Sequence, residues 1–137
     1  MTTNTSDAKN ERQLEMLRQY AEANPSELIP ILELIPIPIC LTNVGGTIEK
    51  VNQAYCDFYG YTREELMENS FLMVVPKDLR PQMLKLHHEF MNTRYEMQGM
   101  WEVLDKYGNL KRILSTAAYL PKNNCHGAYK MTFLVEK

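Results

Sequence analysis

Histidine and cysteine side chains, which most often act as nucleophiles, bases or metal ligands, are few and widely spaced in this chain. They are His87, His88, His126, Cys40, Cys56 and Cys125. No histidine lies in an H-E-x-x-H motif and no two cysteines form a C-x-x-C pair, so neither a zinc site nor a dithiol centre is indicated. No glycine-rich phosphate loop joins a strand to a helix. The sequence therefore predicts a protein that is not an enzyme.

Length and composition indicate one globular domain. The chain has 137 residues, of which 45% are hydrophobic, enough for one buried core and too few for two domains. Lys and Arg number 15 against 17 Asp and Glu, which gives a net charge of −2. Because this balance provides no basic footprint, we expect no nucleic-acid partner and no binding to an anionic membrane.

The sequence shows neither a membrane span nor an export signal. Its longest apolar run, residues 28–41, is interrupted by prolines and charges. The polar start, residues 1–7, lacks the charged and then apolar pattern of a leader. The three cysteines are odd in number and far apart, which favours reduced thiols in or near the core. We therefore expect a cytoplasmic protein without a membrane association.

The first 27 residues are predicted to precede the folded domain. Residues 1–8 are polar and are expected to be disordered, and residues 9–27 are expected to form an amphipathic helix and a linker. The apolar stripe of that helix is narrow and consists of Leu14, Leu17 and Ala21. Such a stripe either docks on the domain or pairs with a second copy of itself, and we predict that it forms a dimer interface.

Two strands and two short helices are predicted next. Residues 37–42 are expected to form an edge-like strand because prolines surround it, and residues 47–52 return as its hairpin partner. Asn52 is placed to cap a helix over residues 53–59, and Gly60 to end it with a positive φ. Thr62 and the glutamate three residues later have the spacing of a capping box.

The rest of the chain reads as one long helix and three strands. The helix is expected over residues 78–92, and the strands over residues 95–104, 110–120 and 127–135. The order of elements predicts an α+β fold, in which a five-stranded antiparallel sheet carries the short helices and the long helix on one face. The folded domain is expected to span residues 28–137.

One run of residues carries a family resemblance. It comprises the Asn52-Gln53-Ala54-Tyr55 step and the run Tyr59-Gly60-Tyr61-Thr62-Arg63-Glu64-Glu65-Leu66. With the hairpin before it, this run resembles the PAS domain family, and the resemblance covers about residues 28–136. It implies the same five-stranded architecture and a role in sensing or signal transduction, such as the input domain of a histidine kinase or a cyclic-dinucleotide enzyme.

A sheet covered by helices encloses space, and the nine methionines of this chain suit an adaptable apolar lining. We predict a ligand pocket lined by these residues: Ile39, Leu41, Tyr55, Phe58, Leu79, Met83, Leu86, His87, Trp101, Met131 and Phe133. The alternative is that these side chains simply form a solid core.

The resemblance raises two cofactors, although the cofactor stays unknown. A haem-binding subgroup of PAS proteins carries its histidine three residues after an arginine that corresponds to Arg80, where this chain has Met83. A haem would then be held by His87, with or without Met83. The photoactive-cysteine motif of flavin-binding relatives is absent around Cys56, and Trp101 is the residue that would stack on a flavin.

The sequence thus predicts a PAS sensory domain that binds a small apolar ligand or cofactor and signals as a homodimer to a downstream effector. The first alternative is a ligand-free PAS module for protein–protein interaction. The second alternative is a haem-binding gas or redox sensor.

Overall fold

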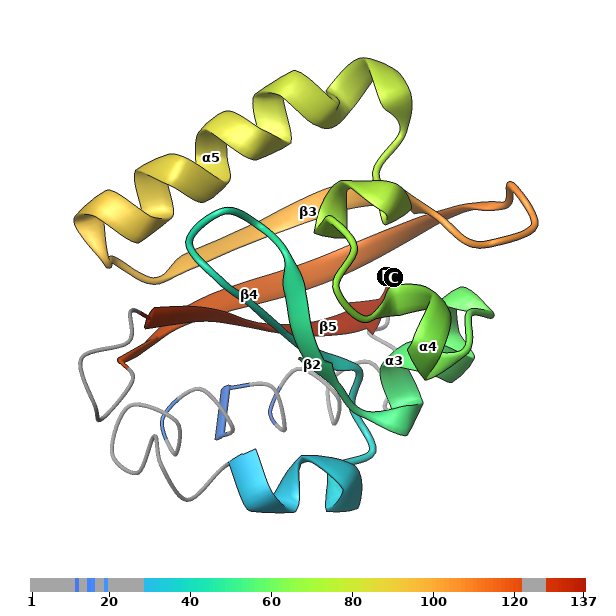
Figure 1. The fold of residues 1–137 in the computed structure, drawn as a ribbon, viewed down its shortest axis with the longest axis horizontal. Helices are drawn as coiled ribbons and strands as arrows, with labels where there is room; N and C mark the ends of the chain where they lie inside the picture. Colours follow the sequence, from blue (N-terminus) through green and yellow to red (C-terminus); the bar gives the residue numbers. More distant parts are fainter. Residues whose placement is uncertain (1–11, 13–14, 17–18, 20–28, 122–127) are drawn as a thin grey trace, which may run out of the picture.

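A computed structural model describes residues 12, 15–16, 19, 29–121 and 128–137 (Figure 1). Within them no helix is both long and apolar enough to cross a bilayer. In chain order the elements are η1 (Ile29–Leu34), β1 (Ile39–Thr42), β2 (Ile48–Val51), α3 (Gln53–Tyr59), α4 (Arg63–Leu66), η2 (Phe71–Val74), η3 (Lys77–Leu79), α5 (Arg80–Thr93), β3 (Met97–Leu104), β4 (Leu110–Pro121) and β5 (Ala128–Glu136).

The five strands form one antiparallel sheet in the order β2-β1-β5-β4-β3. Helix α5 runs along one face of this sheet, and η1 lies on the opposite side (Figure 1). We call the face toward α5 the inner face and the face toward η1 the outer face. The predicted α+β architecture with a long helix and short helices is confirmed.

Strand β1 is not the edge strand that its prolines suggested. It lies between β2 and β5. Pro38 comes directly before the strand and contributes only its carbonyl, which accepts a hydrogen bond from the backbone N–H of Leu134 at 3.2 Å. The missing N–H of a proline therefore leaves no gap in the ladder.

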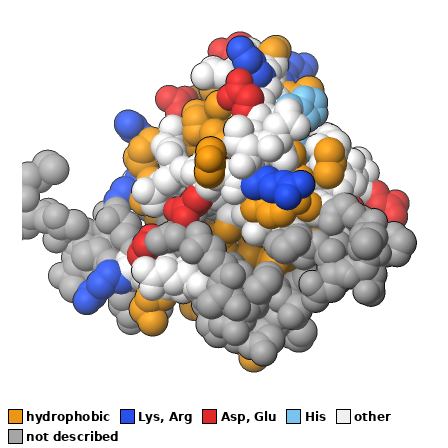
Figure 2. Space-filling model, turned by 90° about the vertical axis from the view of Figure 1, so that its left-hand side faces the viewer, with side chains coloured by type: hydrophobic (Ala, Val, Ile, Leu, Met, Phe, Trp, Pro, Cys, Tyr) orange, Lys and Arg blue, Asp and Glu red, His pale blue; other side chains and the backbone are white. Residues whose placement is uncertain are grey.

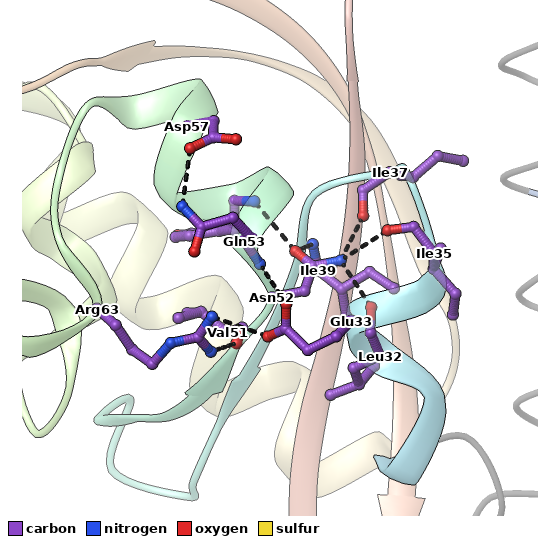
Figure 3. Close-up of polar contacts among 11 residues, drawn as sticks. Leu32, Glu33, Ile35, Ile37, Ile39, Val51, Asn52, Gln53, Asp57 and Arg63 are labelled. Carbon is purple, nitrogen blue, oxygen red and sulfur yellow. Dashed lines mark hydrogen bonds and ion pairs between the residues drawn. The ribbon is translucent and has the colours of Figure 1, made fainter.

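The Asn52 side chain ties β1, η1 and α3 together, and it is completely buried (Figure 3). Its Oδ1 accepts from the backbone N–H groups of Ile39 and Tyr55, both at 3.0 Å, so the predicted helix cap is confirmed. Its Nδ2 donates to three backbone carbonyls that precede β1: Leu32, Ile35 and Ile37. One amide thus satisfies backbone groups of three elements.

The turn between α3 and α4 has the predicted chemistry. Gly60 ends α3 with φ 78°, and its N–H donates to the carbonyl of Cys56. Thr62 and Glu65 form the expected capping box, in which each side chain accepts from the other's backbone N–H. This backbone hydrogen bond at Thr62 is the largest cause that lowers the pKa of Glu65, and Lys106 adds to it.

Replacing Gly60 with alanine is expected to lower the free energy of unfolding by about 2 kcal/mol, because a Cβ is strained at positive φ. That Cβ would also lie 2.9 Å from the Tyr107 ring. Gly108→Ala is the matched control, since Gly108 has φ 82° and open space around its Cβ position. Urea unfolding should show the larger loss for Gly60→Ala; equal losses would mean that the Tyr107 contact adds nothing.

The N-terminal predictions fall largely outside the structure. Leu14, Leu17 and Ala21, and residues 1–8, lie outside the described residues. Of residues 9–27, positions 12, 15, 16 and 19 are described, each with helical backbone and each exposed. The dimer helix therefore stays a prediction.

Candidate ligand cavity

A cavity of about 100 Å³ lies between the inner face of the sheet and the helices that cover it. Its lining is mainly apolar and aromatic. The helical elements contribute Tyr55, Tyr59, Phe71, Val74, Met83, Leu86, His87 and Phe90, with Val75 just beyond η2. The strands contribute Cys40, Thr42, Met97, Gln98, Gly99, Trp101, Val103, Ile113, Ser115, Ala117, Lys130, Thr132 and Leu134.

Five of the predicted pocket residues meet at this cavity: Tyr55, Met83, Leu86, His87 and Trp101. Two others, Phe58 and Leu79, are partly buried and pack against the same hydrophobic cluster without lining the cavity. Helical spacing placed the α5 residues correctly, since Met83, Leu86 and His87 share the side of the helix that faces the sheet.

The remaining four residues were assigned to the wrong face of the sheet. Ile39, Leu41, Met131 and Phe133 are each fully buried, but they belong to a second hydrophobic cluster that includes Leu32 of η1. That cluster lies on the outer face. Successive side chains of a strand point to opposite faces. Because these four side chains lie on the outer face, the residues that alternate with them along β1 and β5 face the cavity.

Lys130 is the most consequential residue that sequence reasoning missed. Its Nζ lies 4.1 Å above the centre of the Phe71 ring. Burial lowers the pKa of Lys130 to about 8, and the nearby Cys40 opposes this shift. Among the described residues, no Asp or Glu forms an ion pair with it. In the sequence, Lys130 and Thr132 alternate with apolar residues, a pattern typical of a strand with one solvent-exposed face. The pattern therefore gave no indication that Lys130 and Thr132 line a cavity.

His87 presents one nitrogen that has no partner in the described part of the chain. Its ring is 1% exposed, and Nε2 lies 3.1 Å and 2.9 Å from the carbonyl oxygens of Asn43 and Val44. Nε2 therefore carries the hydrogen and donates it, which leaves Nδ1 as a buried acceptor. Burial, followed by the charge of Lys130, lowers the pKa of His87 to about 4. The ring is neutral at neutral pH.

Thr42 presents a third polar atom. It is 1% exposed, and its Oγ1 has no hydrogen-bond partner among the described residues. Thr42 and Lys130 are directly opposite each other in the β1–β5 ladder, so both side chains point to the same face. Thr42, Lys130 and His87 therefore line one cavity, and Thr42 Oγ1 and His87 Nδ1 are buried without a hydrogen-bond partner among the described residues.

The thiol of Cys40 completes this polar side of the cavity without adding charge. Burial raises its pKa to about 12, and Lys130 opposes the shift. Burial also raises the pKa of the neighbouring Tyr55 hydroxyl well above its ordinary value. Cys40 and Cys56 are free and buried, as expected of reduced core cysteines, and Cys125 lies outside the described residues.

The residues at the cavity do not fit a haem or a flavin. A volume of about 100 Å³ is well below the roughly 300 Å³ at which pockets begin to take drug-sized ligands. The Nε2 of His87 is already committed to two carbonyls. Met83 and Trp101 line the cavity, but its volume is too small for either ring system.

Charged side chains of both signs are interspersed on the face shown in Figure 2. Its described side chains do not form a patch of one sign. This distribution agrees with the near-neutral composition.

Comparison with known proteins places this geometry in context. The family model described as the PAS fold matches residues 27–120. A search of curated proteins found no match.

Similar solved structures come from several organisms. A PAS domain from Colwellia psychrerythraea is 19% identical with a TM-score of 0.68, covering 81% of this chain and 94% of its own. A PAS domain of an HTR-like protein from Haloarcula marismortui is 15% identical with a TM-score of 0.68, covering 90% and 99%. The PAS domain of BvgS from Bordetella pertussis is 15% identical with a TM-score of 0.65, covering 92% and 87%. At these identities the likeness concerns the fold.

Proposed function

The chain belongs to the PAS family, and from that premise we propose that it is a sensory domain whose cavity holds a small ligand and whose occupied state is passed to a signalling partner. PAS domains are generally sensory, non-catalytic modules. The observation that carries the proposal is a cavity whose lining includes Thr42, His87 and Lys130, with Thr42 Oγ1 and His87 Nδ1 buried and without a hydrogen-bond partner among the described residues.

These atoms favour a ligand over a solid core. A buried donor or acceptor that is left unsatisfied costs about 1–3 kcal/mol, so two such atoms in residues that line one cavity favour an occupant that can satisfy them. A ligand-free interaction module, the alternative, would leave these two atoms unsatisfied. Ordered water is the other occupant that such atoms accept, and the experiment below separates water from ligand.

The sheet offers a route for the signal. On β5, Lys130 and Thr132 face the cavity while Met131 and Phe133 pack in the outer-face cluster. If the ligand binds more tightly when β5 is in one position than in another, ligand binding favours that position. Because Met131 and Phe133 belong to β5, the packing of the outer-face cluster then changes as well. In our proposal the predicted N-terminal helix, through Leu14, Leu17 and Ala21, forms the homodimer that a downstream effector senses.

Native mass spectrometry of the full chain tests this proposal, because it reports bound small molecules and subunit count together. We expect a dimer that retains a small organic ligand, and a monomer that still retains it after residues 1–25 are deleted. A bare chain mass, with no small molecule in an organic extract, would favour the ligand-free module. A full-length monomer that the deletion leaves unchanged would rule out the dimer route.

A further inference from the structure

We propose that the cavity takes a small organic anion, a carboxylate with a short apolar body, and that Lys130 and Thr42 hold its carboxylate. This inference rests on the proposed function and names the ligand class of the same site. It also revises the sequence prediction of an apolar ligand, because the cavity wall includes a cation that the sequence did not reveal.

The charge of the lining favours an anion. Lys130 is the only Lys or Arg among the described residues that line the cavity, and that lining contains no Asp or Glu. His87 adds no second positive charge because burial keeps its pKa low, and Cys40 adds no negative charge because burial keeps its pKa high. Lys130 is half-buried, and a cation that is partly withdrawn from water gains from a counter-charge, which a bound carboxylate supplies.

The geometry provides two donors for one carboxylate. Thr42 and Lys130 are paired across β1 and β5, where opposed Cβ atoms lie about 5 Å apart. An ammonium and a hydroxyl at this spacing reach the two oxygens of the same carboxylate. The centre of the Phe71 ring lies 4.1 Å from Lys130 Nζ, so the ring makes a cation–π contact with the ammonium and restricts the orientations that the Lys130 side chain can adopt. Hydrogen bonds from an ammonium to a carboxylate are charge-assisted and are roughly twice as strong as hydrogen bonds between neutral groups.

The apolar part of the lining and the volume limit the rest of the ligand. Met83, Leu86 and Trp101 line the cavity and provide apolar contact. A dry cavity of roughly 150 Å³ binds benzene, which has six non-hydrogen atoms, so this cavity of about 100 Å³ sets an upper limit of about that size, which an acid of four carbons reaches. Butyrate is therefore the probe, and butyramide, which has the same shape and no charge, is its neutral control.

The experiment is a titration of the full chain with each probe at pH 7, followed by ¹H–¹⁵N NMR. We expect butyrate to bind at least about tenfold more tightly than butyramide, and Lys130→Met to remove about tenfold of the butyrate affinity. The exposed lysine Lys50 of β2 provides the control, and Lys50→Met should leave the affinity unchanged. Thermal unfolding of each variant reports whether it is folded.

A pH series on the unmodified chain tests the same contact without a mutation. Among the described residues, the titratable groups that line the cavity with Lys130 are Cys40 from β1, Tyr55 and Tyr59 from α3 and His87 from α5, and Tyr119 of β4 lies opposite Lys130 in the ladder. Burial shifts the pKa of Cys40 to about 12 and that of His87 to about 4, and it raises the pKa of Tyr55 and of Tyr59, so these four pKa values lie outside the range from 6 to 9.

Lys130, with a pKa of about 8, titrates inside that range. The protonated amine is the form that binds an anion, so butyrate affinity should be constant from pH 6 to 7. It should then fall by up to about tenfold per pH unit above pH 8, whereas butyramide affinity should not change.

The outcomes separate the ligand class from the function. Equal binding of both probes, with no effect of Lys130→Met, overturns the anion inference and leaves a sensor for neutral ligands. Absence of butyrate binding while native mass spectrometry shows a retained small molecule also overturns only the anion inference. If neither probe binds and the chain mass is bare, the proposed function fails together with it.

Discussion

Replacing Asn52 with alanine is expected to lower the free energy of unfolding by about 3–4 kcal/mol, a large part of the 5–15 kcal/mol that stabilises a typical domain. The side chain is completely buried and makes five hydrogen bonds to backbone groups (Figure 3). Its loss removes the cap of α3, worth about 1 kcal/mol, and leaves buried carbonyls and N–H groups without partners.

Urea unfolding monitored by circular dichroism measures this effect. Asn69→Ala is the matched control, because the exposed Asn69 side chain donates one hydrogen bond, to the Glu65 carbonyl at 2.7 Å, and its removal should cost under about 1 kcal/mol. Asn52→Asp should be at least as harmful as Asn52→Ala, since it places a carboxylate against three carbonyl oxygens. Similar losses for Asn52→Ala and Asn69→Ala would show that the network does not hold these elements together.

The second large effect concerns the outer face of the sheet. Phe133→Ala is expected to cost about 3–5 kcal/mol, the usual range for truncation of a fully buried phenylalanine. Phe133 is 0% exposed and packs in the cluster that contains Leu32 and Ile39. Because this cluster lies across the sheet from the cavity, the variant should still bind the cavity probe in the folded state.

The adjacent residue is the matched comparison. Leu134 is also buried, but it lines the cavity, so Leu134→Ala should reduce both stability and probe binding. Guanidinium unfolding and butyrate titration below the unfolding transition measure the two quantities separately. If Phe133→Ala abolished binding while Leu134→Ala did not, the assignment of the two faces would be wrong.

Local sequence was sufficient for the two short helices α3 and α4 and their caps. Gly60 must accept a positive φ, and Thr62 with Glu65 forms a cap whose partners lie within three residues. The cap role of Asn52 was likewise local, since Tyr55 is three residues away. The run from Asn52 to Leu66 also indicated the family, and with it the five-stranded sheet.

What the sequence determined by itself is therefore the five strands, the long helix, the capped helices α3 and α4, and the family, because these depend on patterns and contacts among near neighbours. Only the tertiary structure decided which face of β1 and β5 covers the cavity. Strand alternation sorts side chains into two sets, and here both sets are covered, one by α5 and the other by η1. Lys130 and Thr42 became a candidate site only when β1 paired with β5, across some 90 residues of chain, a contact that no local pattern encodes.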